Sequence, residues 1–221
     1  MSVAHDSRQL FLSGTAGRLE AILWSPSAGQ PATAAVVCHP HPLFGGTMHN
    51  KVVYNAAKAL DALGLPVLRF NFRGTGRSEG KHDKGTGEQD DVRVALDFLA
   101  NEYAKIPLLV AGFSFGCWVG LRVGCEDPRV KSLIGLGAPV NSTDFSFLVQ
   151  CRKPKLFVHG EKDQFGDPVK LKKVVDAAAG DNSVVIVNDA DHFFAGKLEQ
   201  LDSAITSWTK EQISVQPRSG Y

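Results

Sequence analysis

The chain has 221 residues, of which 43% are hydrophobic and 21% charged, and its formal net charge is +1. This length suits one domain with a substantial core, and the balanced charge argues against a nucleic-acid-binding protein, whose basic residues would gather in a stripe. Because the N-terminus lacks the basic and apolar segments of a secretory signal and no apolar run reaches membrane-spanning length, we expect a cytoplasmic protein with no nucleic-acid and no membrane partner.

The first half of the chain predicts an antiparallel hairpin and then alternating strands and helices. Two strand-like runs, 8–12 and 18–24, flank a glycine-containing turn, which is the pattern of a hairpin. The continuous apolar run 34–38 is typical of a strand that a parallel sheet buries on both faces. The other elements predicted here are a helix at 52–63, a strand at 66–72 and an amphipathic helix at 88–103.

The second half continues the alternation and predicts the fold class. Its predicted strands are 106–111, 130–136, 155–159 and 183–187, and its predicted helices are 117–123, 143–149, 168–179 and 196–212. This rhythm predicts an α/β fold with one mostly parallel central sheet and helices on both faces, in a single domain over residues 1–212. Residues 213–221 contain Pro and Gly without periodicity, and we expect a flexible C-terminal tail there.

Four cysteines are spread along the chain without CxxC spacing: Cys38, Cys117, Cys125 and Cys151. They fall on predicted strand, helix and pre-strand positions. This distribution favours free buried thiols over a disulfide framework or a metal site.

The sequence GFSFG at 112–116 places Ser114 between an apolar strand and a helix. This is G-x-S-x-G in the context that gives the motif its meaning, because a sharp turn from strand to helix lifts the serine hydroxyl above the edge of a sheet. The two glycines allow helix and strand to approach each other closely. The motif therefore predicts that Ser114 is a catalytic nucleophile.

A serine nucleophile needs a histidine base and a carboxylate that orients the base. In this type of sheet the chain order is serine, acid, histidine. His192 follows the strand 183–187 and Asp163 follows the strand 155–159, so both lie at the same sheet edge as Ser114. Asp144, which follows the preceding strand, is the alternative acid.

The oxyanion that forms during acyl transfer needs backbone donors already aimed at it. One expected donor is the amide of Phe115, the residue after the nucleophile. The second is expected from the loop after the strand 34–38, where Pro40 and Pro42 have no N–H. That leaves His41, which we prefer, or Leu43.

Short segments spread over most of the chain resemble the α/β-hydrolase superfamily, and the similarity extends from residue 8 to about 212. These segments are 38–46, 71–78, 112–116, 159–163 and 191–194. The chain is most similar to small bacterial members near the dienelactone hydrolases and the hydrolase domain of prolyl oligopeptidases. The resemblance implies an α/β-hydrolase fold. It also favours ester over lactone chemistry, because dienelactone hydrolases proper use a cysteine where this chain has Ser114.

The expected site is open, because many relatives insert a lid in a gap that only residues 137–154 fill here. A minimal or absent lid suits small acyl groups. The pocket residues we expect are Leu43, Phe44, Phe113 and Phe145, and Phe147 and Leu148 are expected to join Phe44 and Phe145 in roofing the site.

These observations predict a serine hydrolase for small or short-chain carboxylic esters that works through an acyl-enzyme intermediate. No cofactor and no metal are expected, because the glycine-rich loop 71–80 matches neither nucleotide-binding template. Thioesterase, lactonase or small-amide hydrolase activity would use the same residues, and a non-catalytic binding protein that kept the fold is a further alternative. The expected partner is a small ester, and the expected state is a monomer or homodimer.

Overall fold

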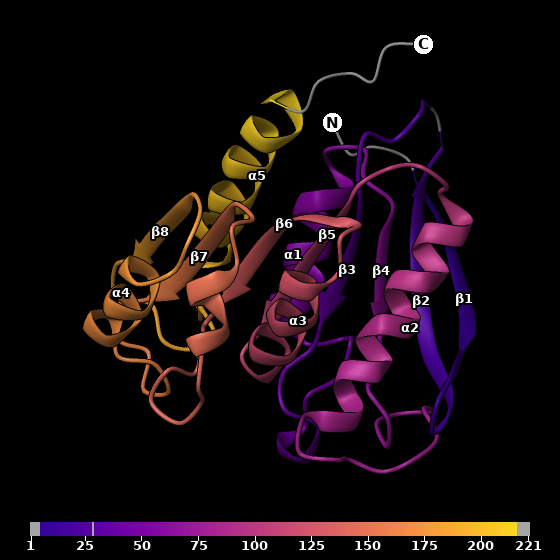
Figure 1. Cartoon of the computed structure of the whole chain (residues 1–221), viewed down its shortest axis with the longest axis horizontal. Coiled ribbons are helices and arrows are strands. Elements are labelled where there is room, and N and C mark those ends of the chain that lie inside the picture. The colour runs from indigo at the N-terminus through magenta and orange to yellow at the C-terminus, as the bar shows by residue number, and fades with distance from the viewer. Residues whose placement is uncertain (1–4, 28, 216–221) are drawn as a thin grey trace.

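The computed structural model describes residues 5–27 and 29–215, and it contains one eight-stranded sheet with helices on both faces (Figure 1). The strand order is β1-β2-β4-β3-β5-β6-β7-β8. The six strands from β4 through β3 and on to β8 are parallel, whereas β1 and β2 form an antiparallel hairpin that joins the sheet along β4. The predicted α/β-hydrolase architecture is confirmed.

The bounds of the strands follow the predicted alternation closely. They are β1 (His5–Gly14), β2 (Gly17–Pro26), β3 (Ala34–Cys38), β4 (Val67–Phe70), β5 (Leu108–Phe113), β6 (Val130–Leu136), β7 (Lys155–Gly160) and β8 (Asn182–Val187). The buried apolar runs become the central strands, as expected for a sheet that is covered on both faces.

The helices are α1 (Lys51–Asp61), α2 (Thr86–Glu102), α3 (Phe115–Glu126), α4 (Pro168–Asp176) and α5 (Leu198–Val215), with short 3₁₀ turns η1 (Pro42–Phe44) and η2 (Ser146–Gln150). Helix α5 continues three residues past the predicted domain end at 212, so the start of the predicted tail is helical. Residues 216–221 lie outside the described residues. Within residues 5–27 and 29–215, no helix is both long and apolar enough to cross a membrane.

Two apolar layers hold the helices against the sheet. Helices α2, α3 and α4 share one layer with alternate strand residues such as Val36 and Val110. Helices α1 and α5 share the opposite layer with the intervening residues Val37 and Ala111. The period-two alternation of a strand thus supplies both cores, and it fixes β5, which carries the site, between two packed layers.

The prediction of four free thiols is wrong for one pair. Cys125 near the end of α3 and Cys151 after η2 form a disulfide, with their Cα atoms 5.4 Å apart. Their sequence separation of 26 gave no local signal, because folding alone brings the end of α3 beside the chain that enters β7. Cys38 and Cys117 are buried free thiols, as predicted. Disulfides are commonest in oxidising compartments, and the cytoplasmic location stays a prediction.

Candidate active site

The turn between β5 and α3 holds Ser114 in a strained conformation, with φ 55° and ψ −117°. A positive φ is uncommon for a residue with a side chain and persists where the surrounding structure imposes it. A Cβ atom on Gly116 would lie 2.5 Å from the carbonyl oxygens of Cys38 and His39, and one on Gly112 would overlap the backbone of Gly116. Both glycines of the motif are therefore required for the close approach of helix and strands.

The structure brings Ser114, His192 and Asp163 together, as the sequence predicts. His192 Nε2 lies 3.0 Å from Ser114 Oγ, and His192 Nδ1 lies 2.8 Å from Asp163 Oδ2. The carboxylate can only accept, so Nδ1 carries the proton and Nε2 is free to accept from the serine hydroxyl. This tautomer is the one that lets a histidine act as a base toward a serine.

Backbone donors fix the acid. Asp163 Oδ1 accepts hydrogen bonds from the amides of Phe165 at 2.8 Å and Gly166 at 3.1 Å, and Oδ2 accepts from His192, with His159 Nε2 3.6 Å away. Both Asp163 and His192 are buried. The alternative acid Asp144 instead accepts from the amide and hydroxyl of Ser146, on the surface. The carboxylate next to His192 is therefore Asp163.

The loop after β3 separates the two alternatives for the second oxyanion donor. The Leu43 amide donates to Nδ1 of His41 at 3.2 Å, so it is already engaged. The amide of Phe115 is the first of helix α3 and has no partner within the helix. His41 and Phe115 both line the cleft that holds Ser114. The role of the His41 amide as a donor stays a prediction.

The cleft around Ser114 has a volume of about 470 Å³ and apolar walls on two sides. Because β3 lies on one side of β5 in the sheet and β6, β7 and β8 lie on the other, loops from the two sides face each other across the serine. Phe44 lines the β3 side, whereas Pro139, Phe165 and Phe193 line the other.

Among the predicted pocket residues, only Phe44 lines this cleft. Leu43 is exposed outside it. Phe113 is buried beneath the site, with its ring 4.9 Å from that of His192. Phe145 is buried against Phe147, with 5.7 Å between the ring centroids.

Leu148 is also a core residue and does not roof the site. Among the cleft residues missed by sequence reasoning is Phe165, because a turn after β7 gives no signal of which neighbour it covers. Its ring lies 4.6 Å from that of His192.

A second pairing of a histidine with a carboxylate lies behind the oxyanion loop. His82 Nδ1 is 2.9 Å from Glu88 Oε1, and the Glu88 carboxylate also accepts from the amides of Asp83 and Gly85 at the start of α2. The rings of His82 and His41 are 4.8 Å apart. Burial and the neighbouring His82 lower the pKa of His41 below its usual range, which keeps that imidazole neutral and able to accept from the Leu43 amide.

The glycine-rich loop 71–80 is structural, as expected. Asn71 accepts from the amide of Met48 at 2.8 Å and donates to Glu20 at 2.8 Å, which ties the hairpin to the start of α1. His39, the residue just after β3, accepts from the amide of Phe72 at 2.9 Å, and burial lowers its pKa to about 4. These contacts build the floor under Phe115, whose ring lies against Phe72.

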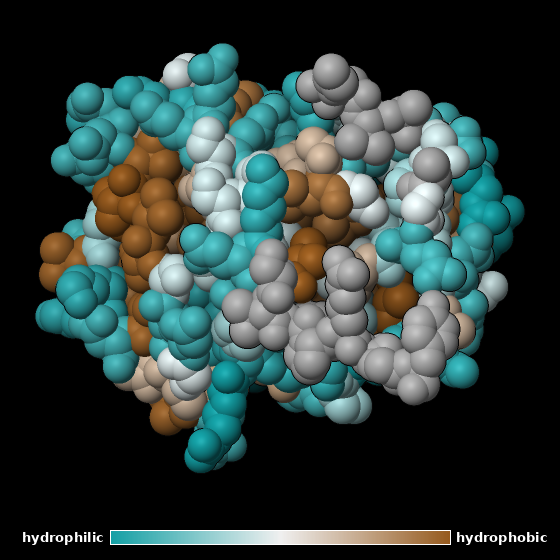
Figure 2. Space-filling view, turned by 90° about the horizontal axis from the view of Figure 1, so that it is seen from above, coloured by the Kyte–Doolittle hydropathy of each residue, from teal (hydrophilic) through white to brown (hydrophobic). Residues whose placement is uncertain are grey.

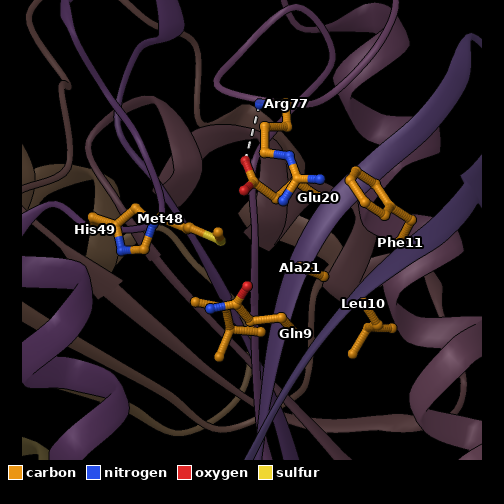
Figure 3. Close-up of a pocket in the computed structure, with 9 residues that line it drawn as sticks. Gln9, Leu10, Phe11, Glu20, Ala21, Met48, His49 and Arg77 are labelled. Carbon is orange, nitrogen blue, oxygen red and sulfur yellow. Dashed lines mark hydrogen bonds between the residues drawn. The ribbon is translucent and has the colours of Figure 1, made fainter.

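A separate hollow of about 290 Å³ lies beside the hairpin (Figure 3). The amide of Arg77 donates to Glu20 Oε2 at 2.9 Å, and its guanidinium lies 4.9 Å from the centre of the Phe11 ring. None of the three residues of the serine site lines this hollow. Among residues 5–27 and 29–215, no three His, Cys, Asp or Glu side chains are grouped as a metal would need.

Comparisons with known proteins agree with this architecture. Residues 33–213 match the model of a family described as an alpha/beta hydrolase domain. An uncharacterised protein of Rickettsia prowazekii is 38% identical over 90% of this chain and 87% of its own length. A crystal structure of a serine hydrolase without a lid from Xanthomonas campestris is 34% identical, with a TM-score of 0.87 over 96% of this chain and 97% of that one. A monoacylglycerol lipase of Mycolicibacterium smegmatis is 30% identical over 55% of this chain and 43% of its own length.

Proposed function

We propose that this chain, which belongs to the alpha/beta hydrolase family, is a serine hydrolase that cleaves small or short-chain carboxylic esters. The observation that supports this most directly is the hydrogen-bonded series from Ser114 through His192 to Asp163, at 3.0 and 2.8 Å. Ser114 and His192 line a cleft, and the backbone of Ser114 is strained. A hydroxyl in this setting meets the requirements of an activated nucleophile.

The proposed reaction has two steps. Ser114 Oγ attacks the ester carbonyl carbon while His192 Nε2 takes the hydroxyl proton, and Asp163 stabilises the imidazolium that forms. The amides of Phe115 and His41 donate to the oxyanion. His192 then protonates the departing alcohol. In the second step a water molecule gives its proton to His192 and attacks the acyl-enzyme, and the acid leaves as Ser114 recovers its proton.

The size and walls of the cleft support the choice of substrate. Its volume of about 470 Å³ holds a small ligand, and the ring of Phe44 on one side faces those of Phe165 and Phe193 on the other. The segment between β6 and β7 contributes only η2, so no long apolar cover extends the cleft. An acyl chain much longer than the cleft would lie in water, and its extra methylenes would add little binding energy.

The relatives agree with ester chemistry without determining the substrate. The relative from Xanthomonas campestris is a serine hydrolase without a lid, and the relative from Mycolicibacterium smegmatis is a monoacylglycerol lipase. Both descriptions belong to those proteins. For this chain they support a carboxylic ester as the first class of substrate to test.

The test compares hydrolysis of p-nitrophenyl esters from acetate to palmitate by wild-type protein and by Ser114→Ala. We expect kcat/KM to fall with increasing chain length, and kcat of the variant to be lower by roughly five to six orders of magnitude. Ser203→Ala, whose hydroxyl donates to the Glu199 carbonyl on α5, is the matched control. A fluorophosphonate should label the wild type but not Ser114→Ala. A drop in kcat of less than tenfold would place the nucleophile elsewhere.

A further inference from the structure

The two outer strands of the sheet expose very different residues. On β1 the exposed residues are polar or charged: Asp6, Ser7, Arg8, Gln9 and Ser13. On β8 the exposed residues are Val184, Val185 and Ile186, with 36%, 36% and 39% of their surfaces accessible. Proteins usually protect an outer strand with charges or prolines, because its free N–H and C=O groups invite pairing with another strand. The β8 edge has no such protection.

A groove with both apolar and charged side chains in its lining runs beside this edge. It lies between β8 and α4, has a volume of about 660 Å³, and includes Val175, Val184 and Ile186 in its lining. Figure 2 shows an apolar patch on the side of the molecule where β8 and α4 lie in Figure 1. Val184 and Ile186 point to the α4 face of the strand, and Val185 points to the other face. Both faces of this edge are therefore apolar.

We propose that two copies of this chain associate through β8, with the two strands antiparallel and Val185 on the two-fold axis. In this register Val184 of one copy is opposite Ile186 of the other, and Val185 is opposite its own symmetry mate. Every exposed aliphatic side chain of the edge then meets another. Because the two-fold axis pairs the β8 edge of one copy with the β8 edge of the other, neither β8 edge remains free, and the pairing does not propagate into a fibre.

The charges on α4 support a second copy as the occupant. Lys172 and Asp176 both line the groove, and they are 2.8 Å apart on the exposed side of α4. Asn182 donates to the Ala178 carbonyl just past α4, so the Asp176 end of the helix lies beside the start of β8. The Lys172 end lies beside Ile186. Antiparallel pairing of the two β8 strands about a two-fold axis therefore brings Lys172 of each copy toward Asp176 of the other. The charges of this surface are thus complementary to those of a second copy.

The arrangement leaves both catalytic clefts accessible. Ser114 and His192 lie beyond the carboxyl ends of β5 and β8, and antiparallel pairing directs these ends to opposite sides of the dimer. Each cleft is built within one copy. Esterase activity per subunit should therefore not depend on association, and it can serve as the measure of correct folding in the variants below.

Cysteine cross-linking tests the register. Residues directly opposite each other in an antiparallel pair have Cα atoms about 4.5–5.5 Å apart, which is within the range for a disulfide. We expect Val185→Cys to form a covalent dimer under mild oxidation. Ser183→Cys, whose opposite residue would be Val187, should remain largely uncross-linked. Equal cross-linking of both variants, or none at position 185, would contradict the proposed pairing.

Sedimentation tests the association itself. We expect the wild type to be a dimer at micromolar concentration, and Val185→Glu to raise the dimer dissociation constant at least about 100-fold, because pairing would bury two unpaired charges. Val149→Glu, at another exposed valine, is the matched control and should leave the constant unchanged. A wild type that stays monomeric up to millimolar concentration would overturn the proposal.

Charge reversal tests the part that α4 plays. Lys172→Asp should weaken the dimer several-fold, because two carboxylates would then face each other across the interface. The double variant Lys172→Asp/Asp176→Lys should restore most of the affinity. If the double variant is as weak as the single one, the two residues do not face each other and the proposed register is wrong.

Discussion

Two pairs of a histidine and a carboxylate lie near the turn that holds Ser114 and Phe115, and each carboxylate is bound by backbone amides. The distances are 2.8 Å from His192 to Asp163 and 2.9 Å from His82 to Glu88. Each carboxylate also accepts two backbone amides. The two histidines differ in their contacts: His192 is hydrogen-bonded to its carboxylate through Nδ1 and has the Ser114 hydroxyl 3.0 Å from Nε2, whereas His82 Nδ1 makes no hydrogen bond within the described part of the chain and its ring lies against that of His41.

The comparison shows that a histidine held by a carboxylate is not by itself a catalytic unit. What gives His192 a proposed role in catalysis is a hydroxyl in front of its free nitrogen and a cleft beside it. His82 does not line that cleft. Glu88 serves the backbone at the start of α2, so this pair shapes the wall against which His41 and Phe115 pack. The predictions below should separate the two pairs.

The largest expected difference is the loss of activity in Asp163→Asn. An amide at this position no longer holds His192 in the tautomer that accepts from Ser114, and it no longer stabilises the imidazolium. We expect kcat for p-nitrophenyl acetate to fall by roughly three to four orders of magnitude. Asp144→Asn is the control and should stay within a few-fold of wild type. If Asp144→Asn has the larger effect, the acid is assigned to the wrong residue.

His39 is a buried histidine with no carboxylate next to it, and the pH dependence of stability tests how burial alone affects a histidine. Burial lowers the pKa of His39 from 6.5 to about 4, so between these values the unfolded chain binds a proton that the folded chain does not. Stability therefore rises with pH across this window, with a slope of up to about 1.4 kcal/mol per pH unit from this residue. Urea unfolding of wild type and His39→Gln between pH 4.5 and 7 should show a shallower slope in the variant. Identical slopes would mean that His39 is protonated in the folded protein.

The smallest expected effect on catalysis comes from Glu88→Gln. The amide oxygen can keep one of the two backbone hydrogen bonds and loses the charge near His82. We expect the free energy of unfolding to fall by about 1 kcal/mol, while kcat changes by less than about fivefold. Chemical denaturation and ester hydrolysis on the same sample measure both. A hundredfold loss of kcat would show that the second pair also acts in catalysis.

The sequence predicted the fold and the three residues of the site because each leaves a local pattern. Ser114 lies in a five-residue motif between a strand and a helix, and His192 and Asp163 follow buried strands in the chain order that parallel topology requires. The shared sheet edge follows from strand direction alone.

The errors concern tertiary contacts between loops and helices that lie far apart in the sequence, which no local sequence pattern encodes. Phe113 alternates into the core as a strand residue, whereas Phe165 reaches the cleft from a turn. The disulfide between Cys125 and Cys151 and the pairing of His82 with Glu88 depend on how α3 and the loop before α2 are placed in three dimensions. A sequence suggests which residues have the chemistry for catalysis or for a disulfide, but three-dimensional packing decides which of these residues come into contact.

The link between Cys125 and Cys151 also has a mechanical consequence. A force applied between the two termini passes through the disulfide and bypasses the 26-residue separation that it closes. At about 3.5 Å per extended residue, roughly 90 Å of chain would stay hidden from a pulling experiment until the bond is reduced. That stored length contains β6, the strand beside the nucleophile. Under tension, therefore, β6 would bear no force, and it would stay within the closed loop between Cys125 and Cys151 after the elements outside that loop had been extended.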